Sequence, residues 1–330
     1  MQRDIRGVVN RSLSDGCAML RTLLLKTLSR SVVFFLLYAS KLIPLKWGYA
    51  LSGALGVTAY SVLPRYRRVA LDNLRIALGE EKPDAELKTI CRCMYVNLIK
   101  NIYEFLLFPR LSRNEIKSMT TLDGEILRKY TAAGNGLVIL TAHLGNWELL
   151  GARIVAEGFN LTVIGKDQRD KMINRLLLYL RTSTGVKNVP KGKGVFTPIM
   201  EALRGNEIVG LLADQNAGPD GLFVDFFGTP ASTFTGPAVF ASKTGAPILP
   251  AFCIRQSDNS HEVVFFEPIL TTRGANEELV EKYTQQYTKC IENIVEKYPE
   301  QWLWLHKRWK TRPEISIPAQ DSAESGKEAP

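Results

Sequence analysis

The stretch Gly136-Leu-Val-Ile-Leu-Thr-Ala-His143-Leu-Gly-Asn-Trp-Glu148 joins an apolar run to a helical pattern and indicates the fold class of the chain. Its first half is a short, continuous apolar run, which is typical of a strand buried on both faces of a parallel sheet. A glycine and an asparagine follow, and then the pattern becomes helical. The stretch therefore predicts a strand, a turn and a helix, with His143 at the turn, where α/β proteins place functional side chains.

The same alternation continues to the C-terminal part of the chain. We expect strands over residues 138–140, 161–165, 208–213, 248–254 and 262–266, and helices over 147–157, 170–183, 195–203, 237–244 and 277–297. Alternation of this kind indicates an α/β fold with a mixed, largely parallel sheet flanked by helices.

Four segments differ in composition. Residues 1–64 are basic and apolar, residues 65–119 have a helical pattern, residues 120–313 hold the expected α/β core, and residues 314–330 form a tail with almost no large apolar side chain. A chain of 330 residues is long enough for more than one structural unit. The tail is predicted to be disordered, because it has too little apolar surface to bury.

The first segment contains two uncharged runs, Ser31–Ser40 and Trp47–Leu63. A bilayer span needs about 20 apolar residues, and the second run is interrupted by glycines. Basic residues flank both runs, which suits a helical section on the cytoplasmic leaflet of an anionic membrane. A buried helical pair of a soluble protein and a true membrane span remain as alternatives.

The net charge of +9 predicts an acidic partner, and the apolar N-terminal runs favour a membrane surface over nucleic acid. The five cysteines are scattered, so we interpret them as reduced thiols on the cytoplasmic side. With only three histidines and no paired metal-ligand spacing, we expect neither a metal nor a cofactor.

His143 and Glu148 suit a general base with an orienting carboxylate, in which the acid favours the imidazolium that forms. A capping histidine and a surface glutamate would produce the same spacing. Asp214 directly follows an apolar strand, where an unpaired acid is costly, so it is a second candidate for orienting His143.

Further polar residues follow other expected strands. Lys166 and Arg169 are suited to binding phosphate or polarising a carbonyl oxygen, or they are solvated loop charges. Thr233 and Thr235 belong to a loop rich in glycine, proline and threonine, residues 224–237, which precedes a helix. These threonines would cap that helix or bind an anion or an acyl chain. For each threonine considered singly, capping is the expected role.

The segment Gln301-Trp-Leu-Trp304-Leu-His306-Lys-Arg308-Trp309 mixes tryptophans with cationic groups. Such a mixture is typical of a surface at the depth of lipid headgroups, although nucleic acid binding uses the same chemistry. His306 has no acid at a short sequence interval, which makes it a weak candidate for a second catalytic histidine.

Taken together, these stretches resemble the bacterial lipid A biosynthesis acyltransferases, within the superfamily of lysophospholipid and glycerol-phosphate acyltransferases. The resemblance rests on an ordered set of residues: His143-Leu-Gly-Asn-Trp-Glu148 (the HX4E motif), Arg169, Asn174, Arg181, Gly185, Asp214-Gln215, Gly218-Pro219, Phe226-Phe-Gly-Thr-Pro230, Thr233-Phe-Thr-Gly236 and Gln301–Trp309. One departure is Asp170, where the family often has proline, and another is the weaker N-terminal apolar segment.

The resemblance implies a glycerol-phosphate acyltransferase-like fold and transfer of a fatty acyl chain from an acyl carrier protein thioester. The acceptor would be a hydroxyl of a lipid A precursor of the Kdo-lipid IVA type, at the cytoplasmic face of the inner membrane. His143 would be the base, Glu148 or Asp214 would orient it, and Arg169 would stabilise the oxyanion or hold a phosphate. Implied substrate-binding residues are Lys166, Asn174, Arg181, Gln215, Thr233, Thr235, Trp304 and Arg308.

Two other functions fit the same residues. One is a phospholipid or glycolipid acyltransferase that uses acyl coenzyme A or acyl carrier protein. The other is a basic, membrane-peripheral binding protein without catalytic activity, which would use only its charged and aromatic surfaces.

Overall fold

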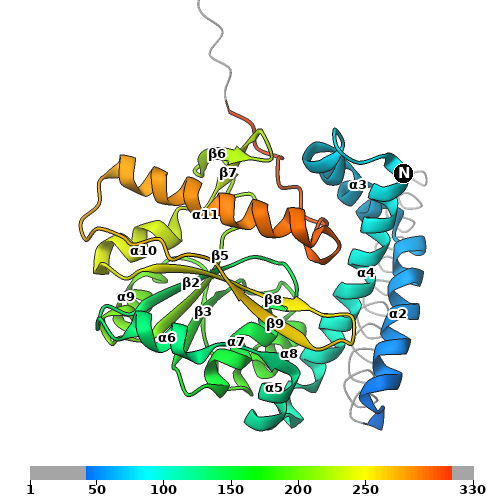
Figure 1. Cartoon of the computed structure of the whole chain (residues 1–330), viewed down its shortest axis with the longest axis horizontal. Coiled ribbons are helices and arrows are strands. Elements are labelled where there is room, and N and C mark those ends of the chain that lie inside the picture. Colours follow the sequence, from blue (N-terminus) through cyan, green and yellow to red (C-terminus); the bar gives the residue numbers. More distant parts are fainter. Residues whose placement is uncertain (1–41, 314–330) are drawn as a thin grey trace, which may run out of the picture.

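The computed structural model describes residues 42–313. The apolar run Ser31–Ser40 and the tail 314–330, for which a membrane segment and disorder were predicted, lie outside the described residues. Figure 1 shows a helix-flanked sheet with a group of helices standing along one side of it.

The main sheet has seven strands in the order β1-β9-β8-β2-β5-β3-β4. Its strands are β1 (Thr120–Thr121), β2 (Leu137–Thr141), β3 (Leu161–Gly165), β4 (Lys187–Pro190), β5 (Ile208–Leu212), β8 (Ile248–Arg255) and β9 (His261–Phe265). All neighbouring strands of this sheet are parallel except β8 and β9, which pair antiparallel. The predicted mixed, largely parallel α/β sheet is confirmed.

Helices cover both faces of the sheet, as Figure 1 shows. They are α5 (Arg113–Met119), α6 (Gly124–Thr131), α7 (Trp147–Ala156), α8 (Lys171–Thr182), α9 (Phe196–Arg204), α10 (Gly236–Thr244) and α11 (Glu277–Lys297). Strand β2 explains why two layers are needed, because its successive side chains point to opposite faces. Val138 and Leu140 pack with buried residues of α9, α10 and α11, whereas Leu137 and Ile139 pack with those of α7.

Several elements were not predicted. The short strands β1 and β4 are not among the predicted elements, and residues 224–237 are predicted as a loop that opens a helix. The structure instead forms an antiparallel hairpin of β6 (Leu222–Phe226) and β7 (Thr229–Thr233), with Phe227 and Gly228 at positive φ in its turn. Proline and alternating small residues concealed the strand pattern in this segment.

Three helices precede the sheet: α2 (Leu45–Val62), α3 (Pro64–Leu78) and α4 (Asp84–Leu107). A short 3-10 helix, Phe108–Arg110, follows α4, and a second one, Pro299–Gln301, follows α11. Helix α2 packs closely on α4 through its glycines, since a Cβ at Gly56 would lie 2.5 Å from the Cα of Val96. Among residues 42–313, no helix is both long and apolar enough to cross a bilayer.

Candidate active site

His143 and Asp214 leave the sheet at the same edge. Strands β2 and β5 are parallel neighbours with Thr141 opposite Leu212, so their carboxyl ends lie side by side. His143 and Asp214 each follow the last residue of its strand by one intervening residue. The register of two apolar strands therefore brings a histidine and a carboxylate together from positions 71 residues apart.

The carboxylate of Asp214 accepts three hydrogen bonds. Its Oδ1 atom lies 2.9 Å from Nδ1 of His143, and its Oδ2 atom accepts from the backbone N–H of His143 at 2.8 Å. The indole Nε1 of Trp302 donates to Oδ2 at 2.8 Å. These contacts fix both the position of the carboxylate and the orientation of the imidazole ring.

Asp214 is buried, with 3% of its surface exposed. Burial alone would raise its pKa, but the adjacent His143 and the three hydrogen bonds hold the pKa below the ordinary value. An ionised carboxylate only accepts hydrogen bonds, so Nδ1 of His143 carries the proton and Nε2 presents its lone pair. With a quarter of the His143 side chain exposed, that lone pair is accessible to a substrate. The pair therefore has the arrangement of a general base with its orienting acid.

The turn that carries His143 is held by backbone geometry. Gly145 has φ +58°, and a Cβ there would lie 1.9 Å from the carbonyl oxygen of Cys253. Asn146 caps α7 by accepting a hydrogen bond from Leu149 N–H at 2.9 Å. The glycine and asparagine are thus required by the close approach of β8 and by the start of the helix.

A buried ionic cluster of side chains from α4 and β8 supports the turn that carries His143. Arg255, on β8, donates to both oxygens of Glu104, on α4, at 2.5 and 2.7 Å. Glu104 also accepts from Nδ2 of Asn146 at 2.6 Å, and Asn101 donates to the carbonyl of Gly145 at 2.6 Å. Burial would raise the pKa of Glu104, but the nearby His261 and Arg255 lower it overall.

Glu104, Arg255 and the hydrogen bond from Trp302 to Asp214 are not among the sequence-based predictions. Two features of the sequence point to them: Glu104 lies within an apolar helical run, and Arg255 ends an apolar strand. Charges in such positions are expected to be buried, and buried charges need partners. Sequence alone shows such charges but not which distant charge pairs with which.

Glu148 contacts Arg181 instead of His143. Its two carboxylate oxygens accept from Nε of Arg181 at 2.9 Å and from an η nitrogen at 2.5 Å. A further η nitrogen of Arg181 donates to Asn188 at 2.7 Å. Among the described residues, no hydrogen bond joins Glu148 to His143. The Glu148–Arg181 ion pair and the bond to Asn188 instead connect α7, α8 and β4.

The loop between β3 and α8 carries Lys166 and Arg169, and both side chains are exposed. Asn174 braces this loop, since its Oδ1 accepts from Gln168 N–H at 2.9 Å and its Nδ2 donates to Asp167 at 3.0 Å. Strand β3 is a parallel neighbour of β5, so this loop leaves the sheet at the same edge as Asp214. The predicted basic loop therefore borders the site, with Asn174 as its support.

Thr233 and Thr235 do not cap α10 with their side chains. Thr233 is fully buried in β7 and donates to the carbonyl of Ala231 at 2.9 Å, while Thr235 makes no side-chain capping bond. The expectation of side-chain capping is therefore wrong: Thr233 pairs within β7, and Thr235 precedes α10 without a side-chain bond to it.

The tryptophans of the C-terminal segment face inward. Trp302, Trp304 and Trp309 are 2%, 0% and 6% exposed, so the predicted lipid-facing surface is wrong for these rings. Arg308 is buried as well and donates to Ser232 O and Thr233 Oγ1 at 2.5 Å each. The segment is instead an internal strap that holds the hairpin and Asp214 in place.

Two further polar side chains lie beside His143. Nε2 of Gln215 is 3.5 Å from Nε2 of His143, at the limit of a hydrogen bond. His306 accepts from the backbone N–H of Asn216 through Nε2 at 3.1 Å. Its Nε2 is therefore engaged, whereas Nε2 of His143 faces only a long contact.

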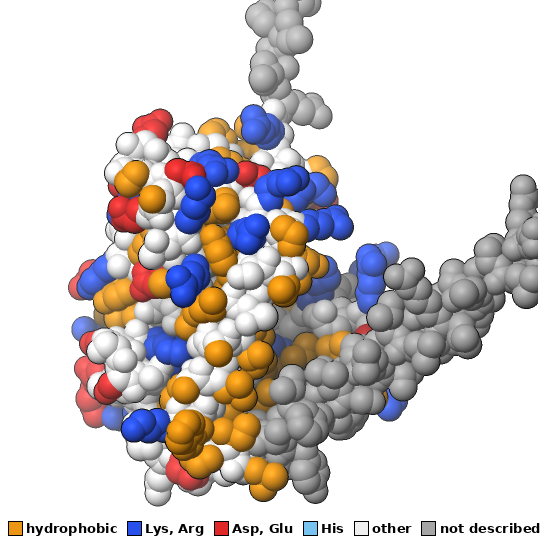
Figure 2. All heavy atoms as spheres, turned by 90° about the vertical axis from the view of Figure 1, so that its right-hand side faces the viewer, with side chains coloured by type: hydrophobic (Ala, Val, Ile, Leu, Met, Phe, Trp, Pro, Cys, Tyr) orange, Lys and Arg blue, Asp and Glu red, His pale blue; other side chains and the backbone are white. Residues whose placement is uncertain are grey.

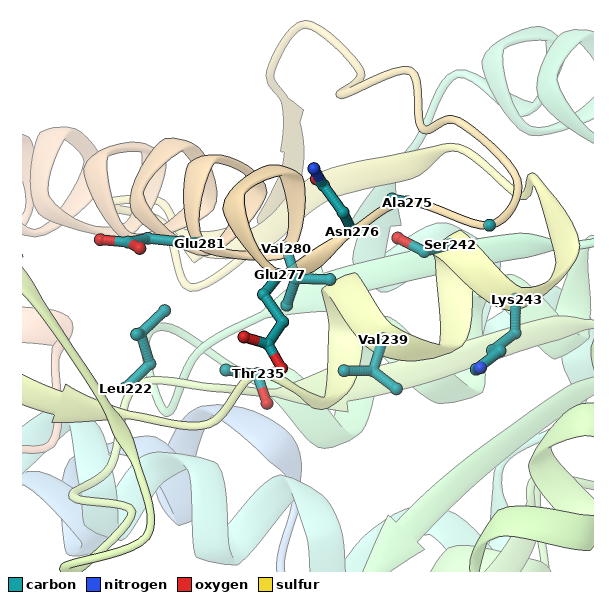
Figure 3. Close-up of a pocket in the computed structure, with 11 residues that line it drawn as sticks. Leu222, Thr235, Val239, Ser242, Lys243, Ala275, Asn276, Glu277, Val280 and Glu281 are labelled. Carbon is teal, nitrogen blue, oxygen red and sulfur yellow. The ribbon is translucent and has the colours of Figure 1, made fainter.

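A separate hollow of about 510 Å³ lies between α10 and α11. Its lining residues are drawn in Figure 3. Thr235, Val239 and Val280 contribute to its wall, with Lys243 and Glu277 at its sides. Neither His143 nor Asp214 lines it. The hollow is thus distinct from the pair that has the chemistry of a base.

The chain is similar to known acyltransferases. It is 29% identical over 181 residues to a phosphatidylinositol mannoside acyltransferase of Mycobacterium tuberculosis (strain CDC 1551 / Oshkosh), a match that covers 54% of this chain and 56% of that protein's length. It is 24% identical to the lipid A biosynthesis palmitoleoyltransferase of Escherichia coli (strain K12), over 78% of this chain and 83% of the relative. With the lipid A biosynthesis lauroyltransferase of that strain it is 25% identical, over 81% and 86%.

The family model of the bacterial lipid A biosynthesis acyltransferases matches residues 19–311. This match includes the His143 turn, Asp214 and the C-terminal strap, and it confirms the resemblance inferred from the ordered motifs. The chain belongs to the bacterial lipid A biosynthesis acyltransferase family.

Proposed function

We propose that the protein transfers a fatty acyl chain from an acyl carrier protein thioester to a hydroxyl of a lipid A precursor of the Kdo-lipid IVA type. The observation that carries the proposal is the His143–Asp214 contact of 2.9 Å, which leaves Nε2 of His143 as an accessible base. Family membership supports the reaction class, and the names of the two Escherichia coli relatives support a lipid A acceptor.

In the proposed reaction, Nε2 of His143 removes the proton from the acceptor hydroxyl as its oxygen attacks the thioester carbonyl. A carbon–oxygen bond forms and the carbon–sulfur bond then breaks, and His143 returns the proton to the departing thiolate. Asp214 stabilises the imidazolium that exists between these steps. Arg169 or Lys166, in the exposed loop bordering the site, would stabilise the oxyanion or bind a phosphate.

No nucleophilic side chain is needed, because a thioester is already activated and direct attack within a ternary complex suffices. Cys93 is an exposed thiol in the described part of the chain, which makes it a useful control. Purified protein is mixed with acyl carrier protein thioester and acceptor lipid, and the product is identified by mass spectrometry. His143→Ala should lose about 10²–10⁴-fold in rate, whereas Cys93→Ser should transfer normally. A near-normal rate for His143→Ala would refute the assignment.

A second candidate is transfer to a glycolipid or phospholipid acceptor, with acyl coenzyme A or acyl carrier protein as donor. The names of the mycobacterial relatives, which are phosphatidylinositol mannoside acyltransferases, favour it. Mass spectrometry of lipids from a strain without the gene decides between the two. Lipid A lacking one acyl chain supports the first function, and altered phospholipids or glycolipids with intact lipid A support the second.

We place the protein at the cytoplasmic face of the inner membrane, on an anionic surface. Supporting this, the large apolar side chains of Trp47, Leu51, Leu55 and Val62 are between 44% and 71% exposed along α2. Figure 2 shows hydrophobic side chains across this side of the molecule and Lys and Arg side chains toward its top. Recovery of the full chain in the soluble fraction of cells at low salt would contradict this placement.

A third possibility is a membrane-peripheral binding protein without catalysis, and nucleic acid is not an expected partner. This possibility predicts that purified protein never cleaves an acyl thioester. Slow hydrolysis that depends on His143 would exclude it.

A further inference from the structure

A basic hollow of about 440 Å³ opens beside the C-terminal strap. Its lining combines the start of α3 with one residue from the far end of the chain: Pro64, Arg65, Arg68, Val69, Asp72 and Lys307. Three cations and one carboxylate therefore surround a space that none of the site residues discussed above occupies.

The cations of this hollow lack protein partners, unlike the other arginines of α3. Arg67 donates to the carbonyl of Tyr60 at 2.9 Å, and Arg75 is 2.8 Å from Asp84. Within residues 42–313, the side chains of Arg65, Arg68 and Lys307 form no hydrogen bond or ion pair, and all three residues are exposed. Like charges one helical turn apart repel each other, so a bound anion would stabilise this arrangement.

The single acid in the lining is partly neutralised. Oδ1 of Asp72 lies 3.5 Å from an η nitrogen of Arg75, outside the hollow. The hollow consequently keeps an excess of positive charge. Two guanidinium groups and an ammonium suit a phosphate group, whose oxygens accept paired N–H donors.

The wall of the hollow is linked to the candidate active site through the C-terminal strap. Nδ2 of Asn73, on α3, donates to the carbonyls of Trp304 and His306 at 2.7 and 2.6 Å, which fixes α3 against the strap. The same strap reaches Asp214 through Trp302. Lys307 directly follows His306, so an anion in the hollow would lie next to the segment that borders His143.

The surroundings point to a lipid as the source of the anion. Val62, Leu63 and Tyr66, at the junction of α2 and α3, are 65%, 40% and 53% exposed beside the basic residues. An amphiphile places its phosphate at the boundary between apolar and charged groups. A free phosphate ion would gain nothing from these apolar neighbours.

We propose that Arg65, Arg68 and Lys307 bind the phosphate group of the lipid acceptor while its hydroxyl reaches His143. The inference rests on the proposed function for the identity of the acceptor, and it adds a headgroup subsite to that function. Specificity would then depend on the acceptor's phosphate, not only on its acyl chains.

The test compares the lipid A precursor with the same precursor after phosphatase treatment. Arg65→Ala/Arg68→Ala should raise KM for the phosphorylated acceptor about tenfold or more, the value of a charge-assisted contact, and should make the two acceptors similar. The matched control is Arg204→Ala/Arg273→Ala, which removes two exposed arginines that line neither hollow. The proposal would be overturned if the ratio of KM for the phosphorylated acceptor to KM for the dephosphorylated acceptor were the same in Arg65→Ala/Arg68→Ala as in the wild type.

A binding measurement separates this inference from the proposed function. The full chain is titrated with neutral detergent micelles that contain either phosphatidic acid or diacylglycerol. Binding that favours phosphatidic acid, and that weakens about tenfold in Arg65→Ala/Arg68→Ala but not in the control, supports the subsite even if no acyl transfer is found. Equal binding of the two micelles would refute the subsite while leaving catalysis by His143 intact. Competition by millimolar inorganic phosphate that these arginines mediate would assign the hollow to free phosphate and overturn the lipid assignment.

Discussion

The Nδ1 atom of His143 lies 2.9 Å from Oδ1 of Asp214, and the backbone N–H of the same histidine donates to Oδ2 at 2.8 Å. One carboxylate thus holds both the ring and the main chain of His143. Glu148, the acid close in sequence, has both oxygens on Arg181. Asp214 and Glu148 therefore have different roles, and substitutions of the two acids should change the rate of acyl transfer by different amounts.

Asp214→Asn should lower the rate of acyl transfer about 10²–10⁴-fold, because the amide neither stabilises the imidazolium nor selects its tautomer. Glu148→Gln should lower it far less, since this carboxylate acts on Arg181. Steady-state rates with saturating acceptor measure both. Equal losses in the two variants would contradict the division of roles.

Gly145→Ala should destabilise the fold by about 4 kcal/mol or more, because the new Cβ would meet the carbonyl of Cys253 at 1.9 Å and the turn would have to move. Gly134→Ala is the matched control: this glycine also has positive φ, but nothing lies within 4 Å of an added Cβ. Gly134→Ala should lower the free energy of unfolding only by the backbone strain at positive φ, about 1–2 kcal/mol. Urea denaturation measures both, and similar losses would show that the contact with β8 is unimportant.

Glu104→Gln should destabilise the protein by about 3–5 kcal/mol, because Arg255 would keep its buried charge without a full partner. The double variant Glu104→Leu/Arg255→Met removes both charges and should be more stable than Glu104→Gln. Thermal unfolding compares them. A single variant as stable as the wild type would show that the cluster contributes nothing to the fold.

The stability should also depend on pH through His261. Burial lowers the pKa of this histidine from 6.5 to about 4, with Glu104 opposing the shift and Arg255 reinforcing it. The unfolded chain binds a proton near pH 6.5 and the folded chain only near pH 4, so stability is full above 6.5 and falls as the pH decreases toward 4. The loss should reach about 3 kcal/mol.

His261→Gln should flatten this part of the profile of unfolding free energy against pH. Urea denaturation of both proteins over that range gives the comparison. An unchanged slope in the variant would show that another group causes the acid sensitivity.

Much of the architecture was predictable from local patterns. Apolar runs such as 208–213 and 248–254 are found as strands β5 and β8, because strands buried on both faces need apolar residues throughout. The hairpin of β6 and β7 was not predicted, because its glycine, proline and threonines resemble a loop. Its strands are held by cross-strand pairing and by Arg308, neither of which is a local property.

Local sequence patterns were sufficient to predict the strand-turn-helix unit, the histidine at its turn and two acids able to orient it. Which of those acids contacts His143 depends on tertiary packing, because the register of β2 against β5 places Asp214 at His143 while α8 brings Arg181 to Glu148. The tertiary structure likewise turned Trp302 inward to donate to Asp214 across 88 positions of sequence. Such contacts depend on how distant elements pack, and a local pattern carries no record of which distant side chain will satisfy a buried charge.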